Sequence, residues 1–284
     1  MAANMKAVKL RIKSVQSTMQ ITKAMQLVAS SKLRKAKERA EKCYPYLTEL
    51  HDTLKTIANA NTDFDSIYAK EAVNEKYCYI VMAGDRGLAG GYNSNLFKAF
   101  EAESAGHDFV VLPIGKKTVE YCKRKKIEIL TEEFAEISEI AVGDCFEMAK
   151  LLCKAFREGK FGHIKMCYTK FVSMLSQVPD MYPVLPVTDL ADDSKLSERQ
   201  DIILYEPDSN EVFDAIVPEY LAGLIYGGVC EGLASELAAR RTAMDAATKN
   251  AGEMIEKLNL HYNRARQASI TQEITEIVAG AEET

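Results

Sequence analysis

Proline and glycine are scarce in this chain of 284 residues, which holds 7 and 15 of them. A chain with so few is neither collagen-like nor a Pro/Gly-rich sequence of low complexity. Because 47% of the residues are hydrophobic and 27% are charged, the composition also excludes wholesale disorder. We therefore expect a folded protein with one large domain or two small ones.

Paired cysteines are missing as well. No two cysteines follow a C-x-x-C spacing, and none lies in a cluster with histidines. The seven stand scattered, at Cys43, Cys78, Cys122, Cys145, Cys153, Cys167 and Cys230. An odd, unpatterned set is typical of free thiols in a reducing compartment. The sequence therefore predicts neither a structural zinc site nor any other metal site.

Long apolar runs and early acidic residues are also absent. The longest charge-free apolar stretch near the C-terminus, Tyr220 to Cys230, has 11 residues including three glycines, whereas a spanning helix needs about 20. The first 30 residues contain no Asp or Glu, as a transit peptide would. The same helical periodicity continues past residue 30, however, so we expect no membrane span and favour no cleaved leader.

Charge is distributed unevenly along the chain. The formal net charge is -5, but residues 1–42 carry +9 and residues 211–284 carry -6. A basic N-terminal segment in an acidic protein predicts an acidic partner for that segment. Nucleic acid, an anionic membrane, an acidic protein loop and the chain's own acidic parts all satisfy this requirement, and composition does not choose among them.

The N-terminal segment is predicted to be one long amphipathic helix. Good helix formers run from about Lys6 to Ile57, interrupted only at Tyr44-Pro45. Apolar or small residues recur every three or four positions, at Val8, Ile12, Val15, Met19, Met25, Val28, Ala29, Leu33, Ala36 and Ala40. The opposite face is cationic.

The C-terminal segment is predicted to be a second long helix, over residues 219–279. Its coiled-coil seam comprises Met244, Ala247, Ala251, Met254, Leu258, Tyr262 and Ala265. Sixty-one helical residues extend roughly 90 Å, whereas a compact chain of this length is about 40 Å across. We therefore expect the helix to project and to pair antiparallel with the N-terminal one. A bundle of shorter helices, broken at the interior glycines, is the alternative.

Between the two helices the pattern alternates. Strands are expected at 77–83, 109–114, 127–130, 165–172 and 202–205, with helices at 94–103, 116–126 and 140–158. This order predicts a small, largely parallel sheet covered by helices. The predicted fold class is thus α/β with long helices: an antiparallel two-helix coiled coil, formed by residues 1–60 and 211–284, and a central Rossmann-like α/β domain over 75–206.

One loop has the composition of a phosphate site. Residues Gly84 to Asn93 follow a predicted strand and precede a helix, which is the arrangement that cradles phosphates. The loop is neither G-x-G-x-x-G nor a P-loop, because it lacks the Gly-Lys-Ser/Thr ending. A tight structural turn or docking loop is the favoured interpretation, and nucleotide binding is the alternative. The four histidines show no ligand spacing, and we predict no catalytic residues and no cofactor.

Three blocks carry a family resemblance. They are Ile12 to Arg34, the Gly84–Asn93 loop, and Tyr262 to Ile277, which reads YNRARQASITQEITEI. Together they resemble the gamma subunits of bacterial F-type ATP synthases, over the whole chain in length and order. Residues 161–201 match only loosely.

The resemblance implies a mechanical function. In that family the terminal helices form the central rotor shaft inside a ring of three alpha and three beta subunits, while the α/β domain docks on the epsilon subunit and the c-ring. The shaft transmits torque between the c-ring and the catalytic beta subunits, so this chain itself would not be an enzyme. Its place would be the cytoplasmic face of the bacterial cell membrane, as a peripheral subunit.

The resemblance also assigns contacts with the beta subunits. Arg266, Gln267 and Thr271 match positions that hydrogen-bond a catch loop of beta, and Met25 and Arg240 match positions that face its lever region. The cationic residues Lys32, Arg34 and Lys35 would meet acidic lever loops. The apolar tip residues Ile270, Ile274, Ile277, Val278 and Ala279 would turn in an apolar sleeve.

Two other functions compete with the rotor. One is a nucleotide-binding α/β enzyme with its site in the Gly84–Gly91 loop. The other is a coiled coil that binds nucleic acid through the basic helix, which would show a steep loss of affinity with salt. The absence of a groove-reading motif and the scarcity of aromatics on the basic face argue against nucleic acid as a partner.

Overall fold

The computed structural model describes residues 2–60, 64–70, 74–190 and 205–282. Side chains are described for these residues except 2–4, 60 and 279–282, so the tip residue Ala279 lies outside them. Most of the strand expected at 202–205 lies outside the described residues as well. The chain divides into two compact units, one of Met1–Ser30 with Arg240–Thr284 and the other of Ser31–Ala239. We refer to them as the helical unit and the sheet unit.

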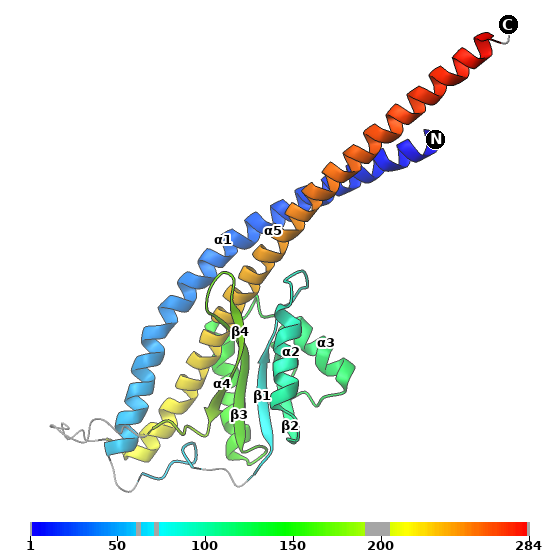
Figure 1. Cartoon of the computed structure of the whole chain (residues 1–284). Helices are drawn as coiled ribbons and strands as arrows, with labels where there is room; N and C mark the ends of the chain where they lie inside the picture. The colour runs from blue at the N-terminus through cyan, green and yellow to red at the C-terminus, as the bar shows by residue number, and fades with distance from the viewer. Residues whose placement is uncertain (1, 61–63, 71–73, 191–204, 283–284) are drawn as a thin grey trace. The chain divides into compact units, whose positions relative to one another are not determined.

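Two long helices contribute to both units. Helix α1 covers Ala2–Ala60 and helix α5 covers Ser209–Glu282 (Figure 1). Helix α1 runs through Tyr44-Pro45, the one place where the run of good helix formers is interrupted. A proline inside a helix removes one backbone hydrogen bond. Pro45 is exposed, while Leu47 and, further along the helix, Leu54 are shielded within the sheet unit, so tertiary packing offsets that loss.

Helix α5 starts ten residues before its expected start at 219. The side chain of Asp208 accepts hydrogen bonds from the backbone N–H groups of Asn210 and Glu211, at 2.7 and 3.0 Å. An aspartate at this position caps a helix by accepting from its first free N–H groups. Phe213 and Val217 then lie fully buried on the new first turns. Pro218 consequently lies inside the helix rather than before it.

The sheet unit contains a mixed sheet of four strands. They are β1 (Tyr77–Met82), β2 (Phe109–Ile114), β3 (His163–Phe171) and β4 (Gln177–Leu185), in the order β2-β1-β3-β4. Strand β1 pairs parallel with both β2 and β3, whereas β4 pairs antiparallel with β3. Prolines lie in β2 and β4, the edge strands, where a missing N–H is tolerated.

The structure corrects two of the expected strands. Strand β4 was not expected, because its two prolines and its acidic residue hide the alternation of a hairpin partner. The strand expected at 127–130 is wrong, since only an isolated bridge joins Ile129 to Val111. The parallel part of the sheet and its helical crossovers agree with the expected fold class, which is confirmed.

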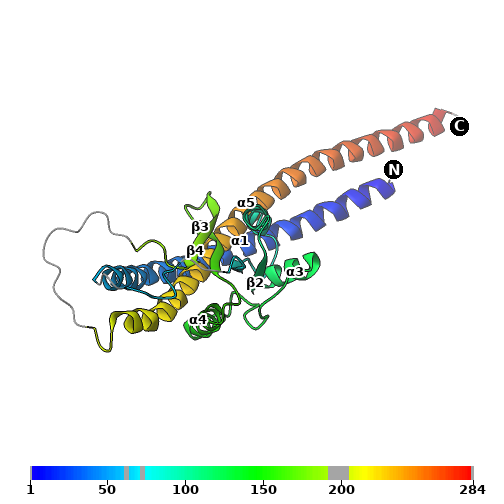
Figure 2. The ribbon, with the colours of Figure 1, turned by 90° about the horizontal axis from the view of Figure 1, so that it is seen from below.

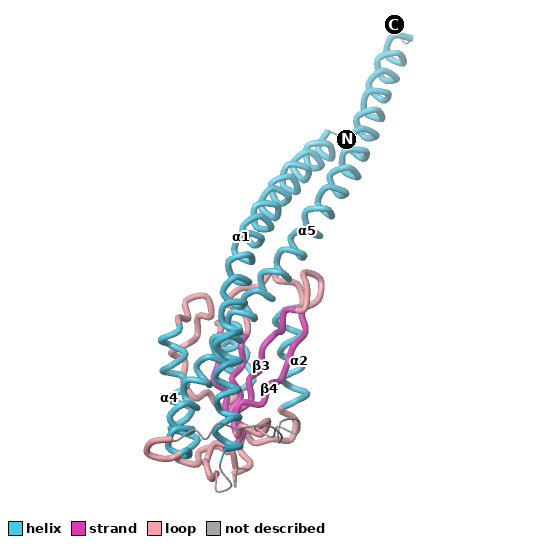
Figure 3. Tube along the Cα trace, turned by 90° about the vertical axis from the view of Figure 1, so that its left-hand side faces the viewer, coloured by secondary structure: helices cyan, strands magenta, loops and turns pink. Residues whose placement is uncertain are grey.

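Both faces of the sheet are covered by helices. Residues of β1 alternate, so Cys78, Ile80 and Met82 belong to one core and Tyr79 and Val81 to the other. Helices α2 (Tyr92–Glu103) and α3 (Lys116–Lys125) cover the second core. Helix α4 (Val142–Arg157) covers the first, together with residues of α1 and α5 from this unit. Figures 2 and 3 show α4 on the side of the strands away from α2.

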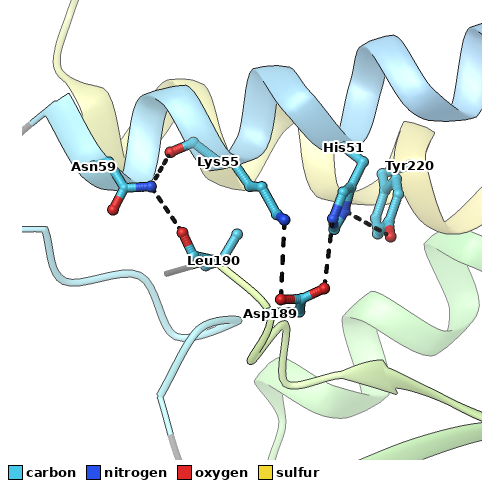
Figure 4. Close-up of polar contacts among 6 residues, drawn as sticks. All are labelled: His51, Lys55, Asn59, Asp189, Leu190 and Tyr220. Atoms are coloured by element: carbon cyan, nitrogen blue, oxygen red, sulfur yellow. Dashed lines mark hydrogen bonds and ion pairs between the residues drawn. The ribbon is translucent and has the colours of Figure 1, made fainter. Parts of the chain in front are cut away.

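The end of α1 is tied to α5 and to the segment that follows β4. The ring of His51 stacks on Tyr220 and lies 3.2 Å from its hydroxyl through Nδ1, while Asp189 approaches both His51 and Lys55 at 4.0 and 3.9 Å (Figure 4). The side-chain amide of Asn59 donates to the carbonyl of Leu190 at 2.7 Å. These contacts fix where α1 lies in the sheet unit.

Among the described residues, one helix is long and apolar enough to cross a membrane by length and composition alone. It lies within Ser209–Val278 and reaches a mean hydropathy of 1.3 over 18 residues, of which 44% are buried in the structure. The core helix of a soluble protein passes the same test. Here Leu221, Ile225 and Val229 are buried in the core against the sheet, so packing accounts for their apolar character.

Candidate functional site

The helical unit is built on one seam between α1 and α5. On α5, solvent-shielded positions repeat in strict steps of four and three, through Met244, Thr248, Ala251, Ile255, Leu258, Tyr262, Ala265 and Ser269. This repeat of 3.5 residues is the heptad of a left-handed coiled coil. Met254 was expected in this seam and is instead 44% exposed, because the four-three rhythm selects its neighbour Ile255.

Helix α1 contributes the matching half of the seam. Shielded positions again alternate in steps of three and four, through Met5, Val8, Ile12, Val15, Met19, Thr22, Gln26 and Ala29. Val28 was expected on this stripe, but it is 56% exposed, since Ala29 holds the seam position. Met25 is half-buried beside the seam.

Two polar contacts cross the seam and set its direction. The hydroxyls of Thr22 and Thr248 lie 2.7 Å apart, and the amide of Gln26 donates to Asp245 at 2.7 Å. A step toward the C-terminus on α1 is therefore matched by a step toward the N-terminus on α5. The helices are antiparallel, as expected. Single polar pairs at core positions of coiled coils define the register of the strands.

The C-terminal end of α5 continues beyond the N-terminal end of α1 (Figures 1 and 3). Residues 270–278 are all exposed. They include four apolar side chains, Ile270, Ile274, Ile277 and Val278, with exposed fractions of 47%, 56%, 73% and 52%. Exposed apolar side chains at this density indicate contact with another molecule.

The structure places three of the expected contact residues next to that end. Arg266, Gln267 and Thr271 are exposed and follow one another within two turns of α5. The carbonyl of Thr271 accepts a hydrogen bond from Thr275 at 2.8 Å, while its own hydroxyl makes no hydrogen bond to a described residue. All three side chains are thus available to a partner. Met25 and Arg240, which lie elsewhere in the helical unit, are both half-buried.

The cationic contact residues lie on α1 in the sheet unit. Lys32, Arg34 and Lys35 are exposed within one turn. Arg34 lies 3.8 Å from Glu38, and both side chains are mostly exposed, so this ion pair stabilises the fold little. Lys32 and Lys35 form no ion pair with any residue that the structure describes. Their charge is directed to solvent or to a partner.

The glycine-rich loop is occupied by its own aspartate. The carboxylate of Asp85 accepts hydrogen bonds from the backbone N–H groups of Lys116, Ile137 and Ser138, at 3.2, 3.0 and 3.1 Å. Lys116 is the first residue of α3, and a helix N-terminus is where a phosphate would bind. Because Asp85 already fills that position with a negative charge, the geometry favours a structural turn over a nucleotide site.

Glycine is required where this loop meets α3. Gly115 has φ of +93°, and a Cβ there would lie 1.9 Å from the carbonyl oxygen of Ala83. No other residue fits such a close approach of two backbones. Among the residues that the structure describes, no group of three potential metal ligands comes together. The sequence predicts no catalytic residues to place.

Sequence reasoning missed the polar part of the seam. The stripe was followed from Met19 directly to Met25, which skips Thr22 and Gln26. A heptad counted strictly from Val8 through Met19 reaches both positions and would have found them. The sequence contains no comparable signal for the hydrogen bonds of Asp85, because its three partners lie 31 to 53 residues away along the chain.

Comparison with known proteins decides the family. The family model described as ATP synthase matches residues 4–283. An ATP synthase gamma chain of Ruminococcus albus is 47% identical over 281 residues, which cover 97% of this chain and 96% of the relative. The chain belongs to the ATP synthase gamma chain family.

Solved structures share the fold. The rotor of Euglena gracilis mitochondrial ATP synthase matches with a TM-score of 0.64 at 18% identity, over 95% of this chain and all of the other. A chain from the OSCP/F1/c-ring part of the same enzyme matches with a TM-score of 0.67 at 17% identity, over 98% and 94%.

Family membership confirms the expected function. The chain is the gamma subunit, the central stalk of an F-type ATP synthase rotor, and it is a non-catalytic subunit of that membrane-associated complex. This excludes the competing interpretations as a nucleotide-binding enzyme and as a nucleic-acid-binding coiled coil.

Proposed function

We propose that the paired terminal helices transmit torque between a c-ring and three catalytic beta subunits. The observation that carries this proposal is the seam of the helical unit, where a continuous heptad is combined with two polar contacts. A packed seam resists relative sliding of the helices, and the Thr22–Thr248 and Gln26–Asp245 contacts oppose a shift of register. Stiffness of this kind is what a shaft needs.

The proposal divides the chain into three parts. Residues 1–60 and 211–284 form the shaft, which projects from the central domain of residues 75–206. That domain docks on the epsilon subunit and the c-ring at the cytoplasmic face of the bacterial membrane. Among the solved structures that share this fold, one is the rotor of a mitochondrial ATP synthase and another is the OSCP/F1/c-ring part of that enzyme. Small-angle scattering of the full-length chain tests the projection, which a roughly spherical particle would contradict.

The contacts with beta are of two kinds. Arg266, Gln267 and Thr271 are proposed to hydrogen-bond a catch loop of beta, and their exposure supports this role. Lys32, Arg34 and Lys35 are proposed to meet acidic lever loops, with Met25 and Arg240 facing the same lever region. Exposed ion pairs contribute only about 0–1 kcal/mol each, so they exchange at every step of rotation.

A reconstituted ring of alpha and beta subunits with this chain tests the proposal. We expect one copy of the chain per three alpha–beta pairs, and ATP hydrolysis that depends on its presence. Rotation of a particle attached to the sheet unit, recorded during hydrolysis, measures torque directly. Assembly and normal turnover of the ring without the chain would contradict the proposal.

A matched pair of variants tests the cationic contacts in that same ring, which lacks epsilon and the c-ring. Changing Lys32, Arg34 and Lys35 to Gln removes three charges from α1, and we expect a lower torque. The control changes Lys98, Lys150 and Lys154 to Gln, which removes the same charge from α2 and α4. Equal torque in the two variants would show that the cationic residues of α1 only solvate a helix face.

A further inference from the structure

The sheet unit contains a cavity that the rotor function does not use. Its volume is about 330 Å³, and it lies between α1, α5 and the hairpin of β3 and β4. This volume falls within the range of small-molecule sites. Tyr44 and Lys170 at its edge are exposed, so the cavity is open to solvent there.

Four tyrosines from four different elements line this cavity. They are Tyr44 of α1, Tyr168 of β3, Tyr182 of β4 and Tyr220 of α5. Aromatic faces arranged around a space attract cations through the negative potential of the ring. The walls therefore suit a positively charged ligand with an apolar body.

One of these tyrosines has an unused polar group. Tyr168 is only 8% exposed, yet its hydroxyl makes no hydrogen bond to any described residue. Tyr220 differs, because its hydroxyl lies 3.2 Å from Nδ1 of His51. This hydroxyl is not among the fully buried polar atoms that lack a partner, so it remains open to the cavity, where a ligand atom can bond to it.

Two carboxylates face the same space. One oxygen of Glu231 accepts a hydrogen bond from the backbone N–H of Phe171 at 3.1 Å, and Asp180 of β4 also lines the cavity. Glu231 is half-buried, and this burial raises the pKa of its carboxyl. Lys170 is the single cationic residue among the lining, and it leaves one negative charge uncompensated.

We propose that this cavity binds a small organic cation, an amidinium or ammonium group on a flat apolar body. The cationic group lies against Glu231 and Asp180, the hydroxyl of Tyr168 bonds to the ligand, and the apolar body packs between the tyrosine rings. An anion would meet two carboxylates, and a neutral ligand would leave the charge of Glu231 unpaired. The proposal does not rest on the rotor function.

Binding of benzamidine to the isolated full-length chain, measured by calorimetry, tests the proposal. Benzamide has the same shape without the charge, and benzoate reverses the charge. We expect saturable binding of one benzamidine, at least tenfold weaker binding of benzamide, and no binding of benzoate. Cys43 lines the cavity and is half-exposed, so bound benzamidine should also slow its alkylation by a maleimide.

Three variants locate the ligand. Glu231→Gln keeps the shape and removes the charge, and we expect about tenfold weaker binding or more, since hydrogen bonds to charged groups are the stronger ones. Tyr168→Phe removes the unpaired hydroxyl and should weaken binding severalfold. Thr48→Trp places a bulky side chain at the exposed rim and should block entry. The control Tyr46→Phe removes a hydroxyl from α1 outside the cavity and should bind normally.

Several results would overturn the proposal. They are no saturable binding of benzamidine, equal or tighter binding of benzamide or benzoate, and unchanged affinity in both Glu231→Gln and Tyr168→Phe. Circular dichroism of each variant reports its folding. Should Glu231→Gln fail to fold, Tyr168→Phe and Thr48→Trp decide the outcome, because one keeps the ring and the other changes only an exposed residue.

Discussion

The same two helices are packed in different ways in the two units. In the sheet unit, α5 buries a broad face, and Phe213, Val217, Leu221 and Ile225 are all fully buried. In the helical unit, only Met244 and Ala251 of the described α5 side chains are less than a tenth exposed. The sheet unit therefore has a core that buries side chains from several elements. The helical unit buries only a single line of side chains along each helix.

The apolar residues outside the seam show what this difference means. Leu10, Ile21 and Leu27 of α1 are 61%, 60% and 65% exposed, and Leu260 of α5 is 60% exposed. Two helices cannot bury such side chains against each other, because each helix offers its partner only one stripe. The sheet unit is stable through its own core, whereas the helical unit leaves apolar surface exposed.

The largest expected effect is in the sheet unit. Phe213 is fully buried, and its ring packs edge-on against Phe64 with centroids 4.8 Å apart. Phe213→Ala should lower the free energy of unfolding by about 3–5 kcal/mol. Hydrogen exchange of peptides from β1 and β3, read during denaturant titration, measures this loss.

Leu258→Ala is the matched change in the helical unit. Leu258 is a half-buried seam residue, so its truncation removes less contact area, and we expect a loss below about 1.5 kcal/mol. Hydrogen exchange of peptides from residues 1–30 provides the reading. If Leu258→Ala lowered the free energy of unfolding as much as Phe213→Ala, the seam would be packed as tightly as the core, which would contradict the comparison.

An effect between those of Phe213→Ala and Leu258→Ala is expected at Asp85, which acts within the sheet unit alone. Asp85→Ala leaves the N–H groups of Lys116, Ile137 and Ser138 without their acceptor and should cost about 2–3 kcal/mol. Asp85→Asn keeps an acceptor oxygen and should cost less. Glu139→Ala, an exposed acidic residue nearby, is the control for loss of charge. Equal stability of the alanine variants would show that these hydrogen bonds contribute nothing.

The long helices and the parallel strands could be predicted because their signals are local. Val8, Ile12 and Val15 repeat within two turns, and β1 is a continuous apolar run. Strand β4 could not be predicted, because its register depends on pairing with β3 and its composition is unlike that of a typical strand. The start of α5 was missed for a related reason, since Pro218 suggests a boundary that burial of Phe213 and Val217 overrides.

Part of the candidate site could likewise be predicted from the sequence, and part could not. Exposure of Arg266, Gln267 and Thr271 follows from a seam that could be counted from the sequence. The cavity could not be foreseen, because Tyr44, Tyr168 and Tyr220 come from three distant segments and only the fold brings them to one space. Local periodicity thus predicts the seam of the helical unit and says little about the inside of the sheet unit.

The next prediction concerns pH and the sheet unit. Burial raises the folded-state pKa of Glu231 above its ordinary value of 4.5. Well below pH 4.5 the carboxyl is protonated in both states and does not change the free energy of unfolding. Between this value and the folded pKa the carboxyl ionises first in the unfolded chain, so raising the pH favours unfolding. Glu231→Gln should therefore gain stability relative to the parent between pH 4 and 7.

Denaturant titrations of both proteins across this pH range provide the measurement, made without any organic cation. Gln keeps an oxygen that accepts from the N–H of Phe171, so the hydrogen bond is preserved. Glu49→Gln, on the exposed face of α1, should show no such trend. A parent that gains stability relative to Glu231→Gln on raising the pH would contradict the expected direction.

The smallest effect is expected in the seam. The hydroxyls of Thr22 and Thr248 lie 2.7 Å apart, and each is also within hydrogen-bond distance of a carbonyl of its own helix, that of Met19 or Met244. Because each hydroxyl has one proton, one threonine donates across the seam while the other donates to its own helix. Each hydroxyl keeps a local partner when the other threonine becomes valine, so a double-mutant cycle should give a coupling of only about 0.5–1 kcal/mol. Thr18→Val, an exposed position with the same bond to its own helix, is the control. A coupling near zero would mean that the apolar heptad alone sets the register. If instead the double variant lost its antiparallel pairing, seen as loss of hydrogen-exchange protection in residues 1–30, this contact would be the main determinant of the register.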